Sequence, residues 1–211
     1  MKRFLFALAA LVIGASGAMA QTTTEFSAKA GIGISNYMGD SKADPQFAYR
    51  VGLGVDITGT GIWGFQTGLN FEGLGARSSE DYMGLSASVH QLYLEVPLMA
   101  TAGIRATDNL KVIFNAGPYL AVGVGGKSSV STEDYDGKIT LSSNTFGEDG
   151  LDLRRFDFGI GLGSTLEIKE HFLVGLDFRI GCLKLDKNYD PDFEDSTARN
   201  FAGFLTFGYK F

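Results

Sequence analysis

Cysteine, histidine and long apolar runs are scarce in this sequence of 211 residues. The single cysteine, Cys182, excludes an intramolecular disulfide, and its place among the apolar positions of an expected strand predicts a buried, unreactive thiol. The two histidines, His90 and His171, leave little material for histidine-based catalysis. After residue 20, no apolar stretch approaches the roughly 20 residues that a membrane-spanning helix requires. Anchoring by a transmembrane helix is therefore not expected.

Basic residues are outnumbered as well. The chain has 18 Lys and Arg against 24 Asp and Glu. Two of those 18, Lys2 and Arg3, lie at the N-terminus, which leaves 16 basic and 24 acidic groups in residues 21–211 (16 − 24 = −8). No basic run is present that could follow a phosphate backbone, so nucleic acid is excluded as a partner.

The N-terminal segment has the pattern of an export signal. Lys2 and Arg3 precede the apolar run 4–13, and small residues follow as Ala18-Met-Ala20. This pattern predicts a secretory signal peptide over residues 1–20 and a mature domain over residues 21–211. The residue directly after the cleavage point is Gln21 and not cysteine, so a lipid-anchored lipoprotein is not expected, and export should end in the periplasm or the outer membrane.

The rest of the chain alternates between apolar and small or polar residues, which is the period of a β-strand. The eight expected strands span residues 26–36, 47–57, 62–76, 88–104, 110–126, 153–168, 172–186 and 199–211. Each has at least the roughly 9 to 11 residues that a tilted strand needs to cross a bilayer. The sequence thus predicts an all-β protein, an eight-stranded antiparallel transmembrane β-barrel.

The connections support this topology because they alternate in length. Segments 37–46, 77–87, 127–152 and 187–198 are long, and segments 58–61, 105–109 and 169–171 are short. Short turns at the periplasmic end and long loops at the outer end are typical of outer-membrane barrels. An even number of strands places both termini on the periplasmic side.

The last strand illustrates the two faces. Phe201, Leu205, Phe207, Tyr209 and Phe211 lie on one face, and Ala202, Thr206, Gly208 and Lys210 on the other. A soluble barrel would show the same alternation with its apolar face turned inward. The lumen of eight strands holds little more than a filling of side chains. The aromatic-rich set is too bulky for that space, which favours an apolar face toward lipid.

Four segments resemble the PorT-type outer-membrane β-barrel family: LYLEVPL at 92–98, FNAGPYLAVGVGGK at 114–127, DFGIGLG at 157–163 and GYKF at 208–211. The resemblance covers nearly all of the expected mature chain. It implies a small barrel in a Gram-negative outer membrane, with the terminal Phe211 read by the barrel-insertion machinery. The family's namesake is linked to protein secretion, but no residue here carries that role over.

The face opposite the apolar one carries five basic and six acidic residues: Lys29, Arg50, Lys111, Arg179 and Lys210 with Asp56, Glu72, Glu95, Asp157, Glu167 and Asp177. Because isolated buried charges are costly, this near balance predicts that they pair and fill the lumen. Glu72 and Glu95 fall at similar heights on adjacent strands, with Arg50 one strand away. We expect these three to form a lumen charge cluster, joined by Arg179 across the barrel. A structural plug is the main interpretation and a gated ion path the alternative.

The long loops are acidic and contain a weak candidate for a metal site. Oxygen ligands recur at Asp186, Asn188, Asp190, Asp192 and Glu194, a spacing that could approach a calcium ion. Pro191 and Thr197 stand where a calcium-binding helix-loop-helix would need its glycine and its bidentate glutamate. The alternative is a solvated acidic loop that repels lipopolysaccharide or bridges to it through divalent ions.

Enzymatic activity has little support in the sequence, and no catalytic residue or cofactor is expected. Ser88 and His90 share one face of a strand near the outer rim, where outer-membrane lipid hydrolases carry a serine and a histidine. Nucleophilic catalysis needs a third group that orients the base, but strand parity turns Glu72 and Glu95 away. A lipid hydrolase is therefore the remote alternative.

The sequence predicts a non-enzymatic protein of the cell outer membrane with a structural or surface-interaction role through its long outer loops. The 26 residues of segment 127–152 are the expected contact surface. A transport or secretion accessory barrel is the second interpretation. The expected partners are outer-membrane lipid and lipopolysaccharide, the insertion machinery and, in either role, other envelope or secretion proteins.

Overall fold

A computed structural model describes residues 22–39, 43–80, 85–134, 137–146, 153–185 and 198–211. Its strands are β1 (Thr23–Met38), β2 (Asp44–Thr58), β3 (Trp63–Glu80), β4 (Leu85–Thr107), β5 (Leu110–Asp134), β6 (Gly137–Asn144), β7 (Phe156–Ile168), β8 (Phe172–Gly181) and β9 (Arg199–Lys210). In the described part of the chain, no helix is long and apolar enough to span a membrane. The expected signal peptide lies outside the described residues.

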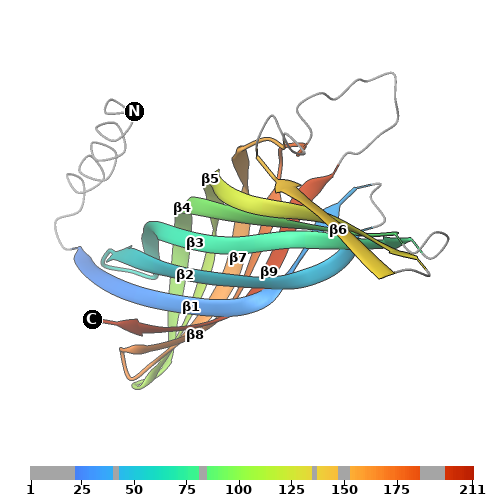
Figure 1. Ribbon diagram of the computed structural model, residues 1–211. Coiled ribbons are helices and arrows are strands. Elements are labelled where there is room, and N and C mark those ends of the chain that lie inside the picture. The colour runs from blue at the N-terminus through green and yellow to red at the C-terminus, as the bar shows by residue number, and fades with distance from the viewer. Residues whose placement is uncertain (1–21, 40–42, 81–84, 135–136, 147–152, 186–197) are drawn as a thin grey trace.

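Eight of these strands close into an antiparallel barrel (Figure 1). Strands β1 to β5 pair in chain order, β5 pairs next with β7, β7 with β8 and β8 with β9, and β9 returns to pair with β1 and completes the ring. The predicted fold class is therefore confirmed. The tight turn between β7 and β8 has the geometry of a β-hairpin turn. Lys169 and Glu170 both have positive φ, and such turns match the twist of the paired strands.

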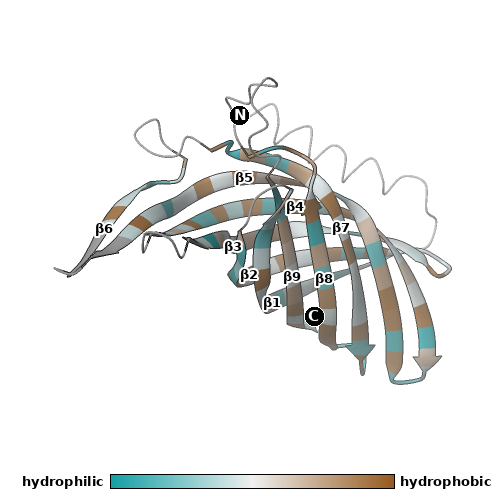
Figure 2. Ribbon diagram, turned by 90° about the vertical axis from the view of Figure 1, so that its right-hand side faces the viewer, coloured by the Kyte–Doolittle hydropathy of each residue, from teal (hydrophilic) through white to brown (hydrophobic). Residues whose placement is uncertain are grey.

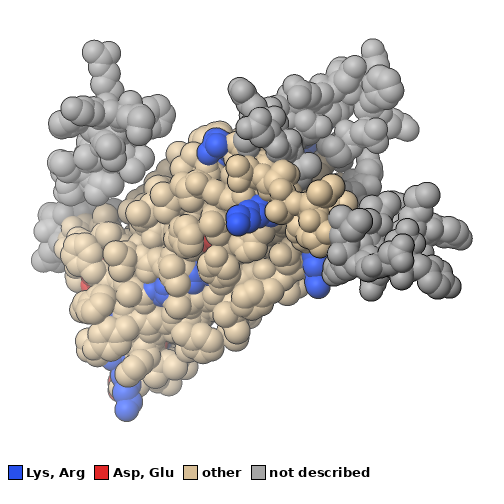
Figure 3. All heavy atoms as spheres, viewed as in Figure 1, with Lys and Arg blue, Asp and Glu red and all other residues tan. Residues whose placement is uncertain are grey.

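The apolar face of the barrel points outward. Leu53 and Trp63 are 68% and 67% exposed, and the same face continues through Ile32, Phe47, Leu69, Phe114, Leu162, Phe178 and Phe207. Brown and teal residues alternate along the strands in Figure 2, and uncharged residues dominate the face shown in Figure 3. This is the arrangement expected of a barrel in lipid and the reverse of a soluble barrel.

Glycine keeps the wall thin where strands or lumen side chains approach closely. A Cβ atom at Gly33 would collide with the carbonyl of Gly203 on β9. One at Gly161 would meet the methyl group of Met99, which reaches across from β4. Gly33 requires glycine because backbone already occupies the space, whereas at Gly161 the flexible end of Met99 would have to move.

Three expectations were wrong at the outer end of the barrel. Segment 127–152 is not all loop, since β5 continues to Asp134 and β6 returns beside it as a ninth strand, outside the barrel ring. The seventh predicted strand, 172–186, ends as β8 at Gly181. Cys182 consequently lies beyond the strand, and its side chain is exposed, not buried. The strand was predicted too long because apolar and polar residues continue to alternate beyond Gly181, where the chain leaves the sheet.

Candidate functional site

Arg179, on β8, lies at the centre of the lumen and is 1% exposed. It forms an ion pair with Glu72 on β3 across the barrel. Its Nη1 lies 3.3 Å from Oε2 of Glu95 on β4, and its Nη2 lies 3.0 Å from Oδ2 of Asp157 on β7. One guanidinium therefore connects strands on opposite sides of the barrel.

Arg50, on β2, makes the second set of contacts. Its Nε donates to Oε1 of Glu72 at 2.6 Å, and its Nη2 lies 3.6 Å from Oε1 of Glu95. Its Nη1 lies 3.9 Å from Oδ2 of Asp177, and its guanidinium sits 4.4 Å from the centre of the Phe204 ring. The two arginines share the same pair of glutamates between them.

The structure thus brings together the four side chains that the sequence placed in one cluster: Arg50, Glu72, Glu95 and Arg179. It adds Asp157, which accepts hydrogen bonds from Asn200 at 3.0 Å and from the Tyr119 hydroxyl at 3.2 Å. The alternation along its strand already predicted that Asp157 faces the lumen. The sequence did not show that Asp157 and Arg179 lie at the same height in the barrel. We call these five residues the lumen cluster.

Aromatic and apolar side chains close the lumen on the outer side of this cluster. The Arg179 guanidinium lies 4.2 Å from the centre of the Tyr119 ring. Tyr93 packs edge-on against Phe146, with ring centres 5.6 Å apart. The buried set is Ala48, Leu74, Tyr93, Tyr119, Ala121, Phe146, Ala202 and Phe204. This filled section separates the lumen cluster from the outer mouth.

Phe146 reaches this position because the chain turns back after β6. Thr145 donates its hydroxyl to the carbonyl of His90 at 2.9 Å, and its amide bonds to Gly126. Arg155 donates to the carbonyl of Phe146 at 2.7 Å. The sequence assigned this segment to a surface loop. Its Phe146 side chain instead fills part of the lumen at the outer end of the barrel.

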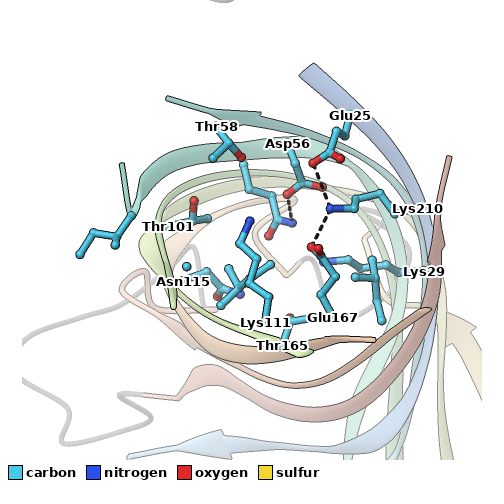
Figure 4. Close-up of a pocket in the computed structure, with 15 residues that line it drawn as sticks. Glu25, Lys29, Asp56, Thr58, Thr101, Lys111, Asn115, Thr165, Glu167 and Lys210 are labelled. Carbon is cyan, nitrogen blue, oxygen red and sulfur yellow. Dashed lines mark hydrogen bonds and ion pairs between the residues drawn. The ribbon is translucent and has the colours of Figure 1, made fainter. Parts of the chain in front are cut away.

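The periplasmic half of the lumen is a vestibule (Figure 4). Lys210 Nζ lies 3.0 Å from Glu25 and 2.6 Å from Glu167, and Asp56 accepts from Gln66 at 2.6 Å. A small cavity among these side chains is also lined by Lys29 and Lys111. A second small cavity continues from Lys29 to Arg50 and Glu95. The strand prediction missed two residues that line the cavity, Glu25 and Thr58, because their strands were expected to begin at residue 26 and to end at residue 57.

Ser88 and His90 do not form a catalytic pair. The Ser88 hydroxyl is 2.9 Å from that of Ser129 on the next strand, and the His90 ring packs against Tyr49, with ring centres 6.2 Å apart. Glu72 and Glu95 are committed to the arginines inside the barrel. Among the residues that the structure describes, no carboxylate is recorded in contact with His90.

The weak calcium candidates Asp186, Asn188, Asp190, Asp192 and Glu194 lie outside the described residues. Within the described ranges, no group of three or more His, Cys, Asp or Glu side chains is arranged to hold a metal ion. The lumen carboxylates instead have arginine, lysine, tyrosine and amide partners.

A closed antiparallel barrel with an apolar outer surface and a charged, filled lumen defines a transmembrane β-barrel. Residues 11–185 match the family described as the outer membrane protein beta-barrel domain, and the chain belongs to that family. The expected location in the outer membrane is thereby confirmed. No curated protein matches the sequence.

Several solved structures have a similar fold. The attachment invasion locus protein Ail of Yersinia pestis is 15% identical, over 89% of this chain and 98% of that one, with a TM-score of 0.41. Neisserial surface protein A is 9% identical, over 90% and 97%, also with a TM-score of 0.41. The N-terminal barrel domain of Pseudomonas aeruginosa OprF is 11% identical, over 90% and 100%, with a TM-score of 0.35.

Proposed function

We propose that this barrel is a non-enzymatic anchor that holds a β-sheet at the cell surface for contact with other molecules. The observation that carries the proposal is the unequal length of the strands. β4 and β5 have 23 and 25 residues, about twice the roughly 9 to 11 that a crossing requires. The lumen cluster and its apolar cap give this sheet a rigid base.

The extended sheet consists of the outer ends of β3, β4 and β5 together with β6 (Figure 1). Hydroxyl pairs lie along one face, as in Ser131 with Thr140 at 3.0 Å. The other face carries Val130 and Leu141, which are paired in the register and are 46% and 73% exposed. Apolar side chains left open at the edge of a sheet are typical of interaction surfaces.

The proposed partners are lipopolysaccharide and other outer-membrane lipids around the barrel, together with envelope or secretion proteins at the sheet. The insertion machinery would act through the C-terminal strand that ends in Phe211, which is 72% exposed. A more specific membership in the PorT-type family is part of the same proposal, and it rests on the four sequence segments that resemble that family.

Crosslinking from the sheet tests the surface role. A photoreactive residue in place of Leu141 is expected to give discrete crosslinked species in intact cells, because that side chain is open on the extended sheet. The matched control places the same residue at Phe207, an exposed position on the lipid-facing side of β9. The adducts would be separated by gel and identified by mass spectrometry. Identical adduct patterns at the two positions, or none at 141, would contradict a surface role for the sheet.

A transport or secretion accessory role is the second candidate, and the periplasmic vestibule favours it. The filled section above the lumen cluster argues against conduction, since Tyr93, Tyr119 and Arg179 are each at most 1% exposed. We therefore expect no stable conductance step from the protein in planar bilayers. A Phe146→Ala variant should behave the same way, because the Arg179 contacts lie beneath Phe146. Regular open-channel steps from the unmodified protein would favour the conduit instead.

A further inference from the structure

The outward face of the sheet changes character along β3, β4 and β5. On β4 the outward residues are Leu94 and Leu92 and then, toward the outer end, His90 and Ser88. On β5 they change from Val122 to Lys127 and Ser129, and on β3 from Phe71 to Arg77. The register places Arg77 beside Ser88 and His90 beside Lys127, so the change occurs at one level on all three strands.

Tyr49 marks this level on the neighbouring strand β2. Its ring lies over Gly73, between Phe71 at 6.5 Å and His90 at 6.2 Å, measured between ring centres. Tyrosines concentrate where the hydrocarbon core meets the headgroups, because the ring is apolar and the hydroxyl is polar. The outward residues of β3, β4 and β5 that lie farther out than this level therefore approach the headgroup layer of the outer leaflet.

Basic residues lie on the outer side of this boundary. Arg77 and Lys127 are exposed on the outward face of the sheet, and Arg199 is exposed at the same end of β9. Asp44 lies opposite Arg77 in the register and offsets part of this charge. Among the described residues at this level, positive charge is in excess, in contrast with the formal charge of −6 for the whole chain. We call Arg77, Ser88, His90, Lys127 and Ser129 the rim patch.

We propose that the rim patch binds the phosphate groups of lipid A in the outer leaflet. This inference rests on the proposed anchor function and names a site for one of its lipid partners. Lipid A places negatively charged phosphates at the level that Tyr49 marks. Arg77 and Lys127 supply charge, and the hydroxyls of Ser88 and Ser129, 2.9 Å apart, supply further hydrogen-bond donors.

Retention of lipid A by the folded full-length protein in detergent, measured by native mass spectrometry, tests the site. The probes are diphosphoryl lipid A, monophosphoryl lipid A and phosphatidylglycerol. We expect retention to fall in that order. Each Lys or Arg beside an anionic lipid surface contributes roughly fivefold in affinity. The R77S/K127S double variant should therefore bind diphosphoryl lipid A at least about tenfold more weakly.

The matched control is R105S/K169S, which removes the same charge from exposed positions at the periplasmic end. It should retain lipid A as the unmodified protein does. If both double variants lost lipid A equally, the effect would be one of net charge and not of this site. If the protein retained phosphatidylglycerol as well as lipid A, it would have no preference for lipid A. Unchanged binding in R77S/K127S would overturn the site. Heat-modifiable migration on gels and outer-membrane fractionation report anchoring separately, so failure of the site and failure of the anchor are distinguishable.

Discussion

Replacing Arg179 with alanine is expected to lower the free energy of unfolding by about 3 to 5 kcal/mol, the usual cost of breaking a buried ion pair. Arg179 pairs with Glu72, Glu95 and Asp157, and it is 1% exposed. Without it, Glu72 and Glu95 would keep only the guanidinium of Arg50, and the buried Asp157 would lose its ion-pair partner. Urea unfolding of the barrel in lipid vesicles, followed by tryptophan fluorescence from Trp63, measures the change.

The Arg50→Ala variant provides a graded comparison at the same cluster. Arg50 borders the periplasmic cavity, and its side chain is 11% exposed, so water can reach the glutamates that it leaves behind. We expect a smaller loss than for Arg179→Ala. Arg105→Ala, at an exposed position, should change stability by no more than about 0.5 kcal/mol. A loss below about 1 kcal/mol for Arg179→Ala would contradict a cluster held together by this arginine.

Replacing Leu53 with arginine should destabilise the folded barrel in lipid by about 2 to 4 kcal/mol, the cost of a charge on the lipid face near mid-membrane. Leu53 is 68% exposed in the middle of the outward face of β2, so this surface must be covered by acyl chains. The measurement is again equilibrium unfolding in vesicles.

Leu53→Ile keeps the site apolar and is expected to stay within about 0.5 kcal/mol of the unmodified protein. A soluble barrel would reverse this expectation, because an arginine on a water-facing strand costs little. If Leu53→Arg were as stable as Leu53→Ile, the outer face could not be in contact with lipid.

Much of the barrel was predictable from local pattern. A strand turns alternate side chains to opposite faces, so the apolar and small sets could be separated before any contact was known. The length of each run and of each connection then predicted closure with both termini at one end. The parity of Arg50, Glu72, Glu95 and Arg179 placed all four in the lumen.

The outer end was less predictable for a physical reason. Between Leu92 and Tyr93 the pairing of β4 with β5 shifts register, and beyond it β5 continues to pair with β6. A segment rich in serine, threonine and acidic residues becomes a strand here because a neighbouring edge offers hydrogen bonds. The same segment then returns Phe146 to the mouth of the barrel. The local composition predicts neither the additional strand β6 nor the position of Phe146 in the barrel.

By itself, the sequence determined the fold class, the outer-membrane location and the sign of each face, because all three depend on residue type and a period of two. The tertiary structure alone decided which charges meet and where the lumen is closed. Contacts such as Arg179 with Glu72 join residues 107 positions apart. Their meeting depends on strand tilt and stagger, which set the height of every side chain inside a closed barrel.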